Sequence, residues 1–384
     1  MSGEPTDLEA GDRHVIFISA GEPSGDLHGA ALARALRDRL PASRLIGLGG
    51  PRMAAEGVEL LADLKDLAVM GFAEVLSRLP YFLRLRKKVF DTLEAERVDL
   101  VIPIDYPGFN LRLARRARGM GVAVLYYIAP QVWAWHASRA RDLARDTDRV
   151  AVILPFEEDF LRESGAAVEF VGHPLLDQDG AAGPLGQLGD EFDPDRPTLA
   201  LFPGSRFQEV QRHLGVFSAT ADILRRRAPE LQVLIGAPSD IPDDAYAGSP
   251  YRVTRSSAAL LRQATAALVK SGTTTLEAAL AETPFVVAYR MNPLTFQLAR
   301  RMVRVPHIAL ANLVAGRRVV PEFVQGAATP EALAGALAPL LDRDSAQRAA
   351  MITELREVRS ALRGGGAGER VAAMAAELLE TRGK

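Results

Sequence analysis

The chain has 384 residues, more than one hydrophobic core usually serves, so two domains are expected. Its charges nearly cancel, with 46 Lys and Arg against 48 Asp and Glu, which argues against a dedicated nucleic-acid-binding protein. The lack of cysteine excludes disulfides, thiolate catalysis and cysteine-ligated metal sites. Residues 1–13 lack the order of a secretory signal, and no run of about 18 apolar residues occurs. A cytosolic enzyme is therefore the general expectation.

The first predicted elements are a buried strand at 15–18, a glycine-bearing loop and a helix from His28 to Leu36. Four consecutive apolar residues suit a parallel strand that is covered on both faces. Gly21 and Gly25 allow the loop backbone to approach a ligand, but the loop lacks both common phosphate-binding glycine spacings. The loop leaves the Glu22 carboxylate at the carboxyl end of the strand, where doubly wound sheets bind their ligands.

Apolar runs of strand length alternate with amphipathic runs of helix length along the chain. In the first half, strands are predicted at 15–19, 44–47, 100–104, 123–128 and 150–154, with helices such as 27–39 and 110–120 between them. The segment 178–197 is rich in Gly, Pro and Asp and is predicted to be a linker. The alternation then restarts, with strands predicted at 198–202, 232–236, 267–270 and 285–289.

We therefore expect an α/β fold in which two Rossmann-like domains, 1–177 and 198–345, face each other across a cleft. The last segment, 346–384, has the alanine- and leucine-rich composition of helices and is interrupted by glycines at 364–366. No short-period repeat competes with this architecture.

One loop of the second half carries residues that suit a diphosphate. Gly204, Ser205 and Arg206 follow a predicted strand and would place a turn, a hydroxyl and a guanidinium where the next helix begins. The purely structural alternative is that Arg206 pairs with Glu209 on its own helix. The preceding glycine and serine favour the binding role.

A second loop places small hydroxyl residues at a helix start, namely Ser271, Thr273 and Thr274 around Gly272. Such residues can act as a helix cap alone. Glu277, one turn further on, is placed to accept hydrogen bonds from two vicinal hydroxyls, such as those of a ribose. This position favours a nucleotide-binding role for the loop.

The chain closely resembles the lipid-A-disaccharide synthases, bacterial glycosyltransferases with a GT-B fold. The resemblance runs over nearly the whole chain and rests on ordered motifs: AGEPSGD (20–26), GPRM (50–53), AVMGFAEV (68–75), IDYPGFN (104–110), PQVWAW (130–135), LPFE (154–157), FVGH (170–173), PGSR (203–206), SGT (271–273), YRM (289–291) and NL (312–313). Two positions depart from the usual pattern. Pro23 stands where alanine is common, and Gly108 stands where an aspartate is expected near the base.

The resemblance implies a reaction. UDP-2,3-diacylglucosamine would donate its sugar, with inversion, to the 6-hydroxyl of 2,3-diacylglucosamine 1-phosphate, giving a β-1,6-linked disaccharide 1-phosphate and UDP. Asp105 follows the strand at 100–104 and would be the general base, although it could instead cap the turn before Asn110. Glu22 would orient the acceptor or assist the base.

The nucleotide would bind to the second domain. Arg206 and the helix start at 271–274 would stabilise the charge that grows on UDP, and Asn312 would lie near the nucleotide. The scheme requires no metal and no cofactor.

Several alternatives remain open from the sequence. His173 is either a rival base or substrate contact, or a hydrogen-bonded hinge residue; the histidine spacing does not suit a metal hydrolase. Trp133, Trp135, Tyr126 and Tyr127 could line a pocket, but core packing is preferred. Two other functions are compatible with the sequence: a UDP-sugar 2-epimerase on a similar two-domain frame, and a nucleotide-sugar- or lipid-binding protein without activity.

A lipid substrate requires access to the membrane, and segment 67–90 mixes apolar and basic residues as interfacial helices do. The predicted membrane and acceptor face consists of Val69, Met70, Phe72, Leu76, Phe82, Arg84, Arg86 and Lys87. Segment 293–305 has a similar mixture of apolar and basic residues. We expect a cytoplasmic protein attached to the inner face of the cytoplasmic membrane. The resemblance also suggests a homodimer, with C-terminal helices packed on the first domain or on a partner protomer.

Overall fold

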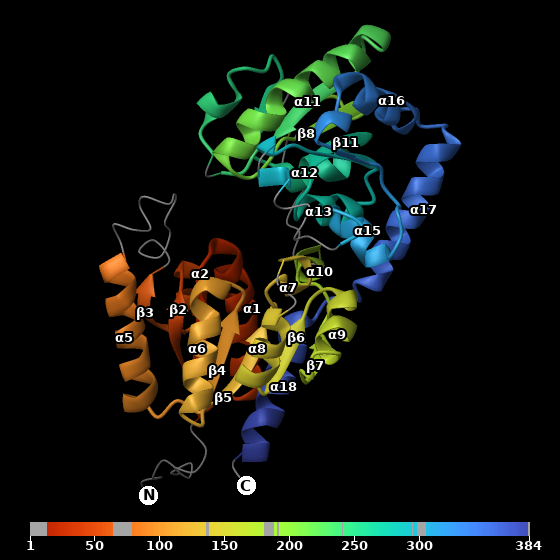
Figure 1. Ribbon diagram of the computed structural model, residues 1–384. Coiled ribbons are helices and arrows are strands. Elements are labelled where there is room, and N and C mark those ends of the chain that lie inside the picture. Colours follow the sequence, from red (N-terminus) through yellow and green to blue (C-terminus); the bar gives the residue numbers. More distant parts are fainter. Residues whose placement is uncertain are drawn as a thin grey trace, which may run out of the picture. The chain divides into compact units, whose positions relative to one another are not determined.

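The computed structural model describes residues 14–63, 79–135, 138–179, 188–189, 192–239, 241–293, 295–297 and 305–382. The chain divides into two compact units (Figure 1). The first consists of residues 1–174 and 365–384, and the second of residues 175–364. Among the described residues, no helix has the length and apolar character needed to cross a bilayer.

The first unit contains a seven-stranded parallel sheet in the order β3-β2-β1-β4-β5-β6-β7. Its strands are β1 (Val15–Ala20), β2 (Arg44–Gly49), β3 (Glu59–Asp63), β4 (Leu100–Ile104), β5 (Ala123–Tyr127), β6 (Arg149–Val152) and β7 (Val168–Phe170). Its helices are α1 (Pro23–Arg39), α2 (Pro51–Ala55), α5 (Leu79–Ala95), α6 (Pro107–Gly119), α7 (Val132–Trp135), α8 (Ser138–Asp146), α9 (Pro155–Arg162) and α18 (Ala367–Arg382).

Side chains along the central strands point alternately to the two faces of the sheet, so this unit has two hydrophobic cores. Ile16 and Ile18 of β1 pack with apolar residues of α1 and α18 on one face, whereas Phe17 packs with those of α5, α6 and α8 on the other. Burial on both faces explains why these strands read as unbroken apolar runs. Strand order reverses between β1 and β4, so the carboxyl ends of these two strands form the switch point at which such sheets bind ligands.

The second unit contains a six-stranded parallel sheet in the order β10-β9-β8-β11-β12-β13. Its strands are β8 (Thr198–Phe202), β9 (Gln232–Gly236), β10 (Arg252–Thr254), β11 (Ala266–Lys270), β12 (Phe285–Tyr289) and β13 (Glu322–Val324). Its α-helices are α10 (Leu175–Asp179), α11 (Phe207–Arg227), α12 (Ser257–Gln263), α13 (Thr274–Leu280), α15 (Leu310–Ala315), α16 (Pro330–Leu341) and α17 (Ala346–Ala361), with short 3₁₀ turns η1 (Asp243–Tyr246) and η2 (Gln325–Ala327). The switch point here lies between β8 and β11.

The last two helices belong to different units, although the sequence analysis grouped them as 346–384. Helix α17 packs on α13, α15 and α16 in the second unit, and Arg317 binds Glu354 and Glu357 on it at 2.7 and 2.8 Å. Helix α18 packs on α1 and β5 of the first unit (Figure 1). Arg370 of α18 donates a hydrogen bond to the carbonyl oxygen of Val171 at 2.7 Å. The chain thus returns to its first unit after Gly364.

Candidate active site

The turn after β4 holds the predicted base in an uncommon backbone conformation. Asp105 and Tyr106 have φ angles of +45° and +48°, a conformation that residues other than glycine adopt uncommonly. The Tyr106 ring lies against Gly21 in the loop after β1: a Cβ atom at Gly21 would stand 2.2 Å from a ring carbon. The glycine predicted from the sequence is therefore required for close approach of these two loops.

Hydrogen bonds from buried side chains fix this turn. Asn110 of α6 is fully buried, and its Nδ2 donates to the carbonyl oxygens of Ser19 and Ile104, both at 3.1 Å, and of Asp105 at 2.9 Å. The Ser19 hydroxyl donates to Asn110 Oδ1 at 2.7 Å. Tyr126 of β5, also fully buried, donates its hydroxyl to the Asp105 carbonyl at 2.8 Å. The network joins β1, β4, β5 and α6 around one residue.

The environment of Asp105 makes its carboxylate a stronger base than usual. Partial burial, followed by the nearby negative charge of Glu22, raises the pKa of Asp105 to about 6. Burial and Glu22 also raise the pKa of Tyr106. Glu22 itself is exposed at the start of α1 and makes no cap with its side chain. The structure thus brings together the two carboxylates that the sequence analysis singled out.

A third carboxylate, which the sequence analysis missed, belongs to the same cluster. Glu157 at the start of α9 is 2% exposed; Trp133 Nε1 donates to its Oε1 at 2.9 Å and the Leu154 N–H to its Oε2 at 3.1 Å. Burial, and to a lesser degree the charge of Asp105, raises the pKa of Glu157 to about 7. Trp133 is half-buried, and its ring meets Phe156 edge-on at 5.1 Å. It therefore has a polar partner in addition to core contacts.

His173 is a weaker base than Asp105. It is 6% exposed, and burial, together with His28 on α1, lowers its pKa to about 4. Burial lowers the pKa of His28 to about 4 as well. A neutral imidazole with so low a pKa accepts a proton less readily than a carboxylate with a pKa of about 6, which favours Asp105 as the base.

In the second unit, the loop after β8 is organised by Glu209 of α11. The Ser205 N–H donates to Glu209 Oε2 at 3.0 Å, and Lys270 at the end of β11 donates to Oε1 at 2.9 Å. Although burial alone would raise it, these donors hold the pKa of Glu209 below its usual value. Gly204 has φ +146°, and a Cβ there would approach the Glu209 Cβ to 2.5 Å. Neither Glu209 nor Lys270 was predicted as a site residue.

Arg206 is left largely free by this arrangement. Its guanidinium lies 3.6 Å from Glu209, but its side chain is 79% exposed, whereas the Lys270 and Glu209 side chains are 15% and 17% exposed. The buried pair with Lys270 satisfies Glu209, so the alternative structural role of Arg206 is secondary. The guanidinium remains accessible to an anionic ligand.

A buried histidine ties α11 to the end of β12. His213 is 1% exposed; its Nδ1 lies 2.8 Å from the Glu209 carbonyl, and the Arg290 N–H donates to its Nε2 at 2.9 Å. The second bond requires Nε2 to be unprotonated, so Nδ1 carries the hydrogen. The Lys270 ammonium lies 5.6 Å from the centre of the Tyr289 ring. The carboxyl ends of β8, β11 and β12 thus converge on one charged cluster.

Hydrogen bonds to Ile308 and Leu310 hold the loop after β11 in place. Ser271 donates its hydroxyl to the Ile308 carbonyl at 2.7 Å, and Thr275 donates to the Gly272 carbonyl at 2.7 Å while accepting from the Leu310 N–H at 3.1 Å. Ser271 therefore serves the loop rather than presenting a free hydroxyl. Thr273 is exposed and Thr274 is half-buried.

The side chains of two further predicted residues differ in how far their hydrogen-bonding groups are free to bind a ligand. Glu277 is half-buried, burial raises its pKa, and no residue of the described chain donates a hydrogen bond to its side chain. Asn312 is fully buried and its amide is saturated. It donates to the Val320 carbonyl at 3.0 Å and to Glu322 at 2.8 Å, and accepts from the N–H groups of Val319 at 2.8 Å and Val320 at 2.9 Å. Every hydrogen-bonding position of this amide is therefore taken by the protein.

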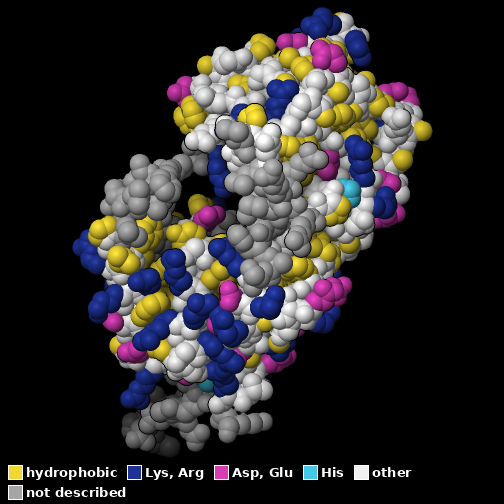
Figure 2. Space-filling view, in the orientation of Figure 1, with side chains coloured by type: hydrophobic (Ala, Val, Ile, Leu, Met, Phe, Trp, Pro, Cys, Tyr) yellow, Lys and Arg dark blue, Asp and Glu magenta, His cyan; other side chains and the backbone are white. Residues whose placement is uncertain are grey.

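Only part of the predicted membrane face can be described. Val69, Met70, Phe72 and Leu76 lie outside the described residues. On α5, Phe82 is half-buried against the core and Leu83 is 45% exposed. The cations Arg84, Lys87 and Lys88 are exposed, Arg86 is half-exposed, and Lys87 pairs with Asp91 at 2.7 Å. Figure 2 shows Lys and Arg side chains gathered on the first unit over α5, α6 and α8.

Comparison with known proteins identifies related sequences. A family model described as lipid-A-disaccharide synthetase matches residues 16–365. The lipid-A-disaccharide synthase of Trichlorobacter lovleyi is 43% identical over 378 residues, covering 95% of this chain and 97% of the relative. Those of Geobacter sulfurreducens and Neisseria meningitidis are 41% and 40% identical, covering 95% and 84% of this chain and 97% and 88% of the relatives.

Among the described residues, no group of three or more acidic or histidine side chains could hold a metal ion.

Solved structures share the fold at low sequence identity. The kitacinnamycin glycotransferase has a TM-score of 0.64 at 18% identity, covering 96% of this chain and 99% of that one. The calicheamicin glycosyltransferase CalG4 has a TM-score of 0.61 at 16% identity, with coverages of 97% and 100%. A UDP-GlcNAc 2-epimerase from Neisseria meningitidis has a TM-score of 0.59 at 9% identity, with coverages of 96% and 100%. These likenesses confirm the GT-B type of fold, and the epimerase likeness extends no further than the fold.

Proposed function

The chain belongs to the lipid-A-disaccharide synthase family and is a glycosyltransferase of lipid A biosynthesis, and from this premise we propose how its residues perform the transfer. The donor is a UDP-diacylglucosamine and the acceptor a diacylglucosamine 1-phosphate. The acceptor 6-hydroxyl oxygen attacks C1 of the donor sugar. The bond from C1 to the UDP oxygen breaks, and UDP leaves with the bonding electrons. The hydroxyl proton passes to the protein.

Asp105 accepts that proton. The observation that carries this assignment is its place in a turn with positive φ angles at the β1/β4 switch point, where burial, followed by the charge of Glu22, raises its pKa to about 6. A carboxylate with this pKa is ionised near pH 7 but still accepts a proton readily in the transition state. Glu22, exposed beside it, is the group that orients the acceptor and raises the basicity of Asp105.

The second unit binds UDP. Arg206, with an exposed guanidinium, and the loop formed by Gly204 and Ser205 hold the diphosphate and stabilise the charge that develops on it. Glu277, half-buried and without a protein donor in the described chain, accepts hydrogen bonds from the ribose hydroxyls. Thr273 and Thr274 supply further hydroxyls, whereas Ser271, Gly272 and Asn312 keep their loops in place.

The acylated substrates are taken from the inner face of the cytoplasmic membrane. The basic surface over α5 suits anionic headgroups, and residues 64–78 precede it with the apolar side chains predicted to meet acyl chains. Changing Arg84 and Lys88 to Glu should reduce sedimentation with anionic vesicles. The matched change of Arg225 and Arg226 on α11 should not. The protein would also form a homodimer, which light scattering would test.

The direct test of the proposed function is turnover with both substrates. Protein incubated with UDP-diacylglucosamine and the acylated acceptor should release UDP and disaccharide 1-phosphate in equal amounts. Turnover of the donor that does not depend on acceptor would contradict the transfer and point to an epimerase, and binding without turnover would indicate a non-catalytic protein. A sample with the donor alone serves as the control.

A further inference from the structure

Arg52 is an exposed cation at the carboxyl edge of the first unit's sheet. It is the second residue of α2, which begins just after β2 ends. Among the described segments that leave the strands of this unit, taken to the second residue of the next helix, it is the one Lys or Arg. His173 also lies there, but burial lowers its pKa to about 4, so it is neutral near pH 7. Within this described edge, an anion therefore finds its permanent positive charge at Arg52.

The backbone of α2 is fixed to the loop that carries Glu22. The Asp26 carboxylate, 4% exposed in the first turn of α1, accepts the N–H groups of Gly50 at 2.8 Å, Met53 at 3.0 Å and Arg52 at 3.2 Å. The Asp26 N–H in turn donates to the Glu22 carbonyl oxygen at 3.0 Å. Because Asp26 uses the N–H groups at the start of α2, the Arg52 side chain is the part of this segment that can bind an anion.

Packing around Met53 fixes α2 from its inner side. The Met53 side chain is fully buried, and its sulfur fills the space beside two glycines. A Cβ atom at Gly29 of α1 would stand 2.5 Å from that sulfur, and one at Gly49 of β2 would stand 2.4 Å from it. Helix α2 thus packs directly on α1 (Figure 1). The backbone position from which Arg52 extends is therefore well defined.

The same contacts connect α2 to the proposed base. The loop that ends at Glu22 packs through Gly21 on the ring of Tyr106, which follows Asp105. Strand β1 lies between β2 and β4, and neighbouring strands are roughly 4.8 Å apart. The start of α2 and the turn at Asp105 are therefore separated by two strand spacings, on the order of 10 Å. An arginine side chain and one sugar ring together can span that distance.

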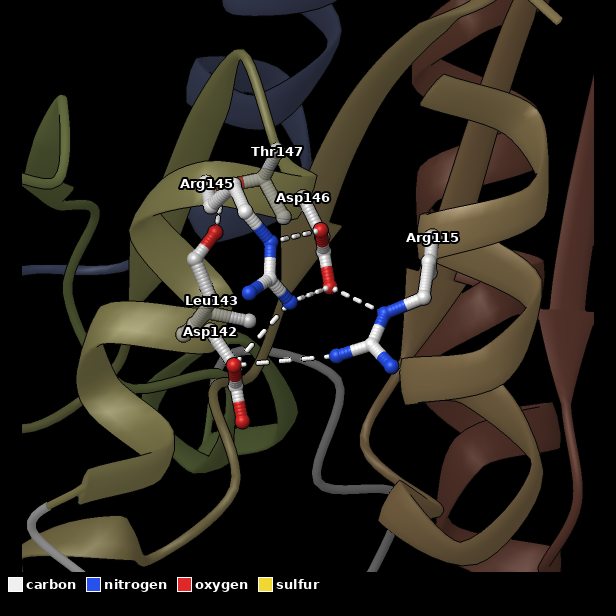
Figure 3. Close-up of polar contacts among 6 residues, drawn as sticks. All are labelled: Arg115, Asp142, Leu143, Arg145, Asp146 and Thr147. Atoms are coloured by element: carbon white, nitrogen blue, oxygen red, sulfur yellow. Dashed lines mark hydrogen bonds and ion pairs between the residues drawn. The ribbon is translucent and has the colours of Figure 1, made fainter. Parts of the chain in front are cut away.

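The Arg52 guanidinium is free to bind a ligand. In the described part of the chain, no carboxylate forms an ion pair with it. Other arginines of this unit are paired: Arg115 of α6 binds Asp146 at 3.0 Å, and Arg145 of α8 binds Asp142 at 3.0 Å (Figure 3). An unpaired guanidinium on a fixed backbone suits phosphate, because its planar N–H groups can donate two parallel hydrogen bonds to phosphate oxygens.

We propose that Arg52 binds the 1-phosphate of the acceptor and thereby directs the acceptor 6-hydroxyl toward Asp105. The proposal rests on the proposed transfer reaction, whose acceptor is a sugar 1-phosphate. The phosphate and the 6-hydroxyl are attached at different positions of one rigid ring, so holding the phosphate limits where the hydroxyl can lie. Arg52 is then a specificity residue that distinguishes phosphorylated from unphosphorylated acceptors.

The kinetic test compares acceptors with and without the 1-phosphate. Arg52→Ala should lower kcat/KM for diacylglucosamine 1-phosphate about tenfold or more, because a bidentate, charge-assisted contact is lost. With diacylglucosamine, which lacks the phosphate, the variant and the wild type should react equally slowly. Arg52→Lys keeps the charge but not the paired donors and should lose less. An equal loss with both acceptors would overturn the proposal.

The matched control is Arg39→Ala. Arg39 is the last residue of α1, exposed, and also without an ion pair in the described chain, but it lies at the opposite edge of the sheet. Its removal changes the net charge by the same amount and should leave both acceptors unaffected. If Arg39→Ala lowers kcat/KM for the phosphorylated acceptor as much as Arg52→Ala does, the effect is one of net charge and the site is wrong.

A second test needs no turnover and separates this proposal from the proposed function. The acceptor, in detergent micelles and without donor, is titrated into the protein by calorimetry. Arg52→Ala should weaken binding of diacylglucosamine 1-phosphate and leave the affinities for diacylglucosamine and UDP unchanged. If the titrations behave so but no disaccharide forms with donor, the phosphate site exists and the proposed function is wrong. If transfer proceeds but Arg52→Ala binds the phosphorylated acceptor as the wild type does, the site is wrong.

Sedimentation with anionic vesicles distinguishes the acceptor phosphate from lipid headgroups. Arg52→Ala should sediment as the wild type does, because the proposed contact is with the acceptor. A variant that loses vesicle binding while it binds both acceptors normally would assign Arg52 to the membrane surface and overturn the proposal. Far-UV circular dichroism of every variant checks that the comparison is made on folded protein.

Discussion

Asn110 donates its side-chain amide to the carbonyl oxygen of Asp105 at 2.9 Å, so the proposed base is fixed from the helix that follows it. The same amide reaches the carbonyls of β1 and β4, and its oxygen accepts the Ser19 hydroxyl. One buried side chain therefore determines how the two strand ends at the switch point approach each other.

Asn110→Ala should destabilise the first unit and reduce the rate of transfer. The substitution leaves buried carbonyls and the Ser19 hydroxyl without partners, which costs roughly 2–4 kcal/mol in the free energy of unfolding. Asn312→Ala is the matched control, since Asn312 is equally buried and makes four hydrogen bonds in the second unit. The urea midpoint should fall for both variants, because both lose buried hydrogen bonds, whereas kcat should fall for Asn110→Ala and UDP affinity for Asn312→Ala. Equal loss of UDP affinity in both would contradict separate roles.

Gly21→Ala should inactivate the enzyme, because its Cβ would stand 2.2 Å from the Tyr106 ring and force the turn at Asp105 to move. Gly108→Ala is the control: it lies in the first turn of α6, and a Cβ there meets nothing within 4 Å. Steady-state rates of the two variants test the difference. If Gly21→Ala keeps wild-type activity, the close packing of Tyr106 on Gly21 is not needed for catalysis.

Arg206→Ala should weaken UDP binding and lower kcat/KM by about tenfold or more, since the charge would serve both the nucleotide and the transition state. Arg227→Ala, at the exposed far end of the same helix, should change neither. Calorimetric titration with UDP and initial rates measure both effects. Unchanged affinity and rate for Arg206→Ala would remove this residue from the diphosphate site.

Glu157 should make the protein less stable as pH rises. Its folded pKa of about 7 lies above the ordinary value of 4.5. As the pH rises between these two values, the unfolded chain releases this proton before the folded chain does, so the free energy of unfolding falls. The free energy of unfolding lost in this way is on the order of 3 kcal/mol: none of it is lost below pH 4.5, and all of it is lost above pH 7. Glu157→Gln removes it, so the variant's stability relative to wild type should increase between pH 5 and pH 8 in urea unfolding. A constant difference would mean that the folded pKa is not raised.

Much of the fold follows from the sequence because the central strands are buried on both faces. Strands predicted at 15–19, 100–104, 198–202 and 285–289 match β1, β4, β8 and β12 closely. The missed strands β3, β10 and β13 lie at the sheet edges, and each has at most one buried residue, so they carry no continuous apolar run. Their pairing depends on neighbours that the local sequence does not specify.

The site was predictable only where a polar residue directly ends an apolar strand. Asp105 directly follows β4, and Glu22 lies in the loop two residues after β1; Lys270, which ends β11, carries the same signal and was overlooked. Glu157 and Asn110 could not be found so, because their partners come from other strands and helices. The resemblance placed Asn312 near the nucleotide, but only the structure shows that its amide is fully used within the protein.

The central claim is that Asp105 takes the acceptor's proton, and Asp105→Asn tests it most directly. The substitution removes the proton acceptor with little change in volume, so kcat should fall about 100-fold or more. UDP affinity should stay at the wild-type value, because the nucleotide-binding residues lie in the other unit. The measurement is turnover of both substrates together with UDP titration on the same preparation. A folded Asp105→Asn protein that transfers the sugar at the wild-type rate would contradict the account and move the base to Glu22 or His173.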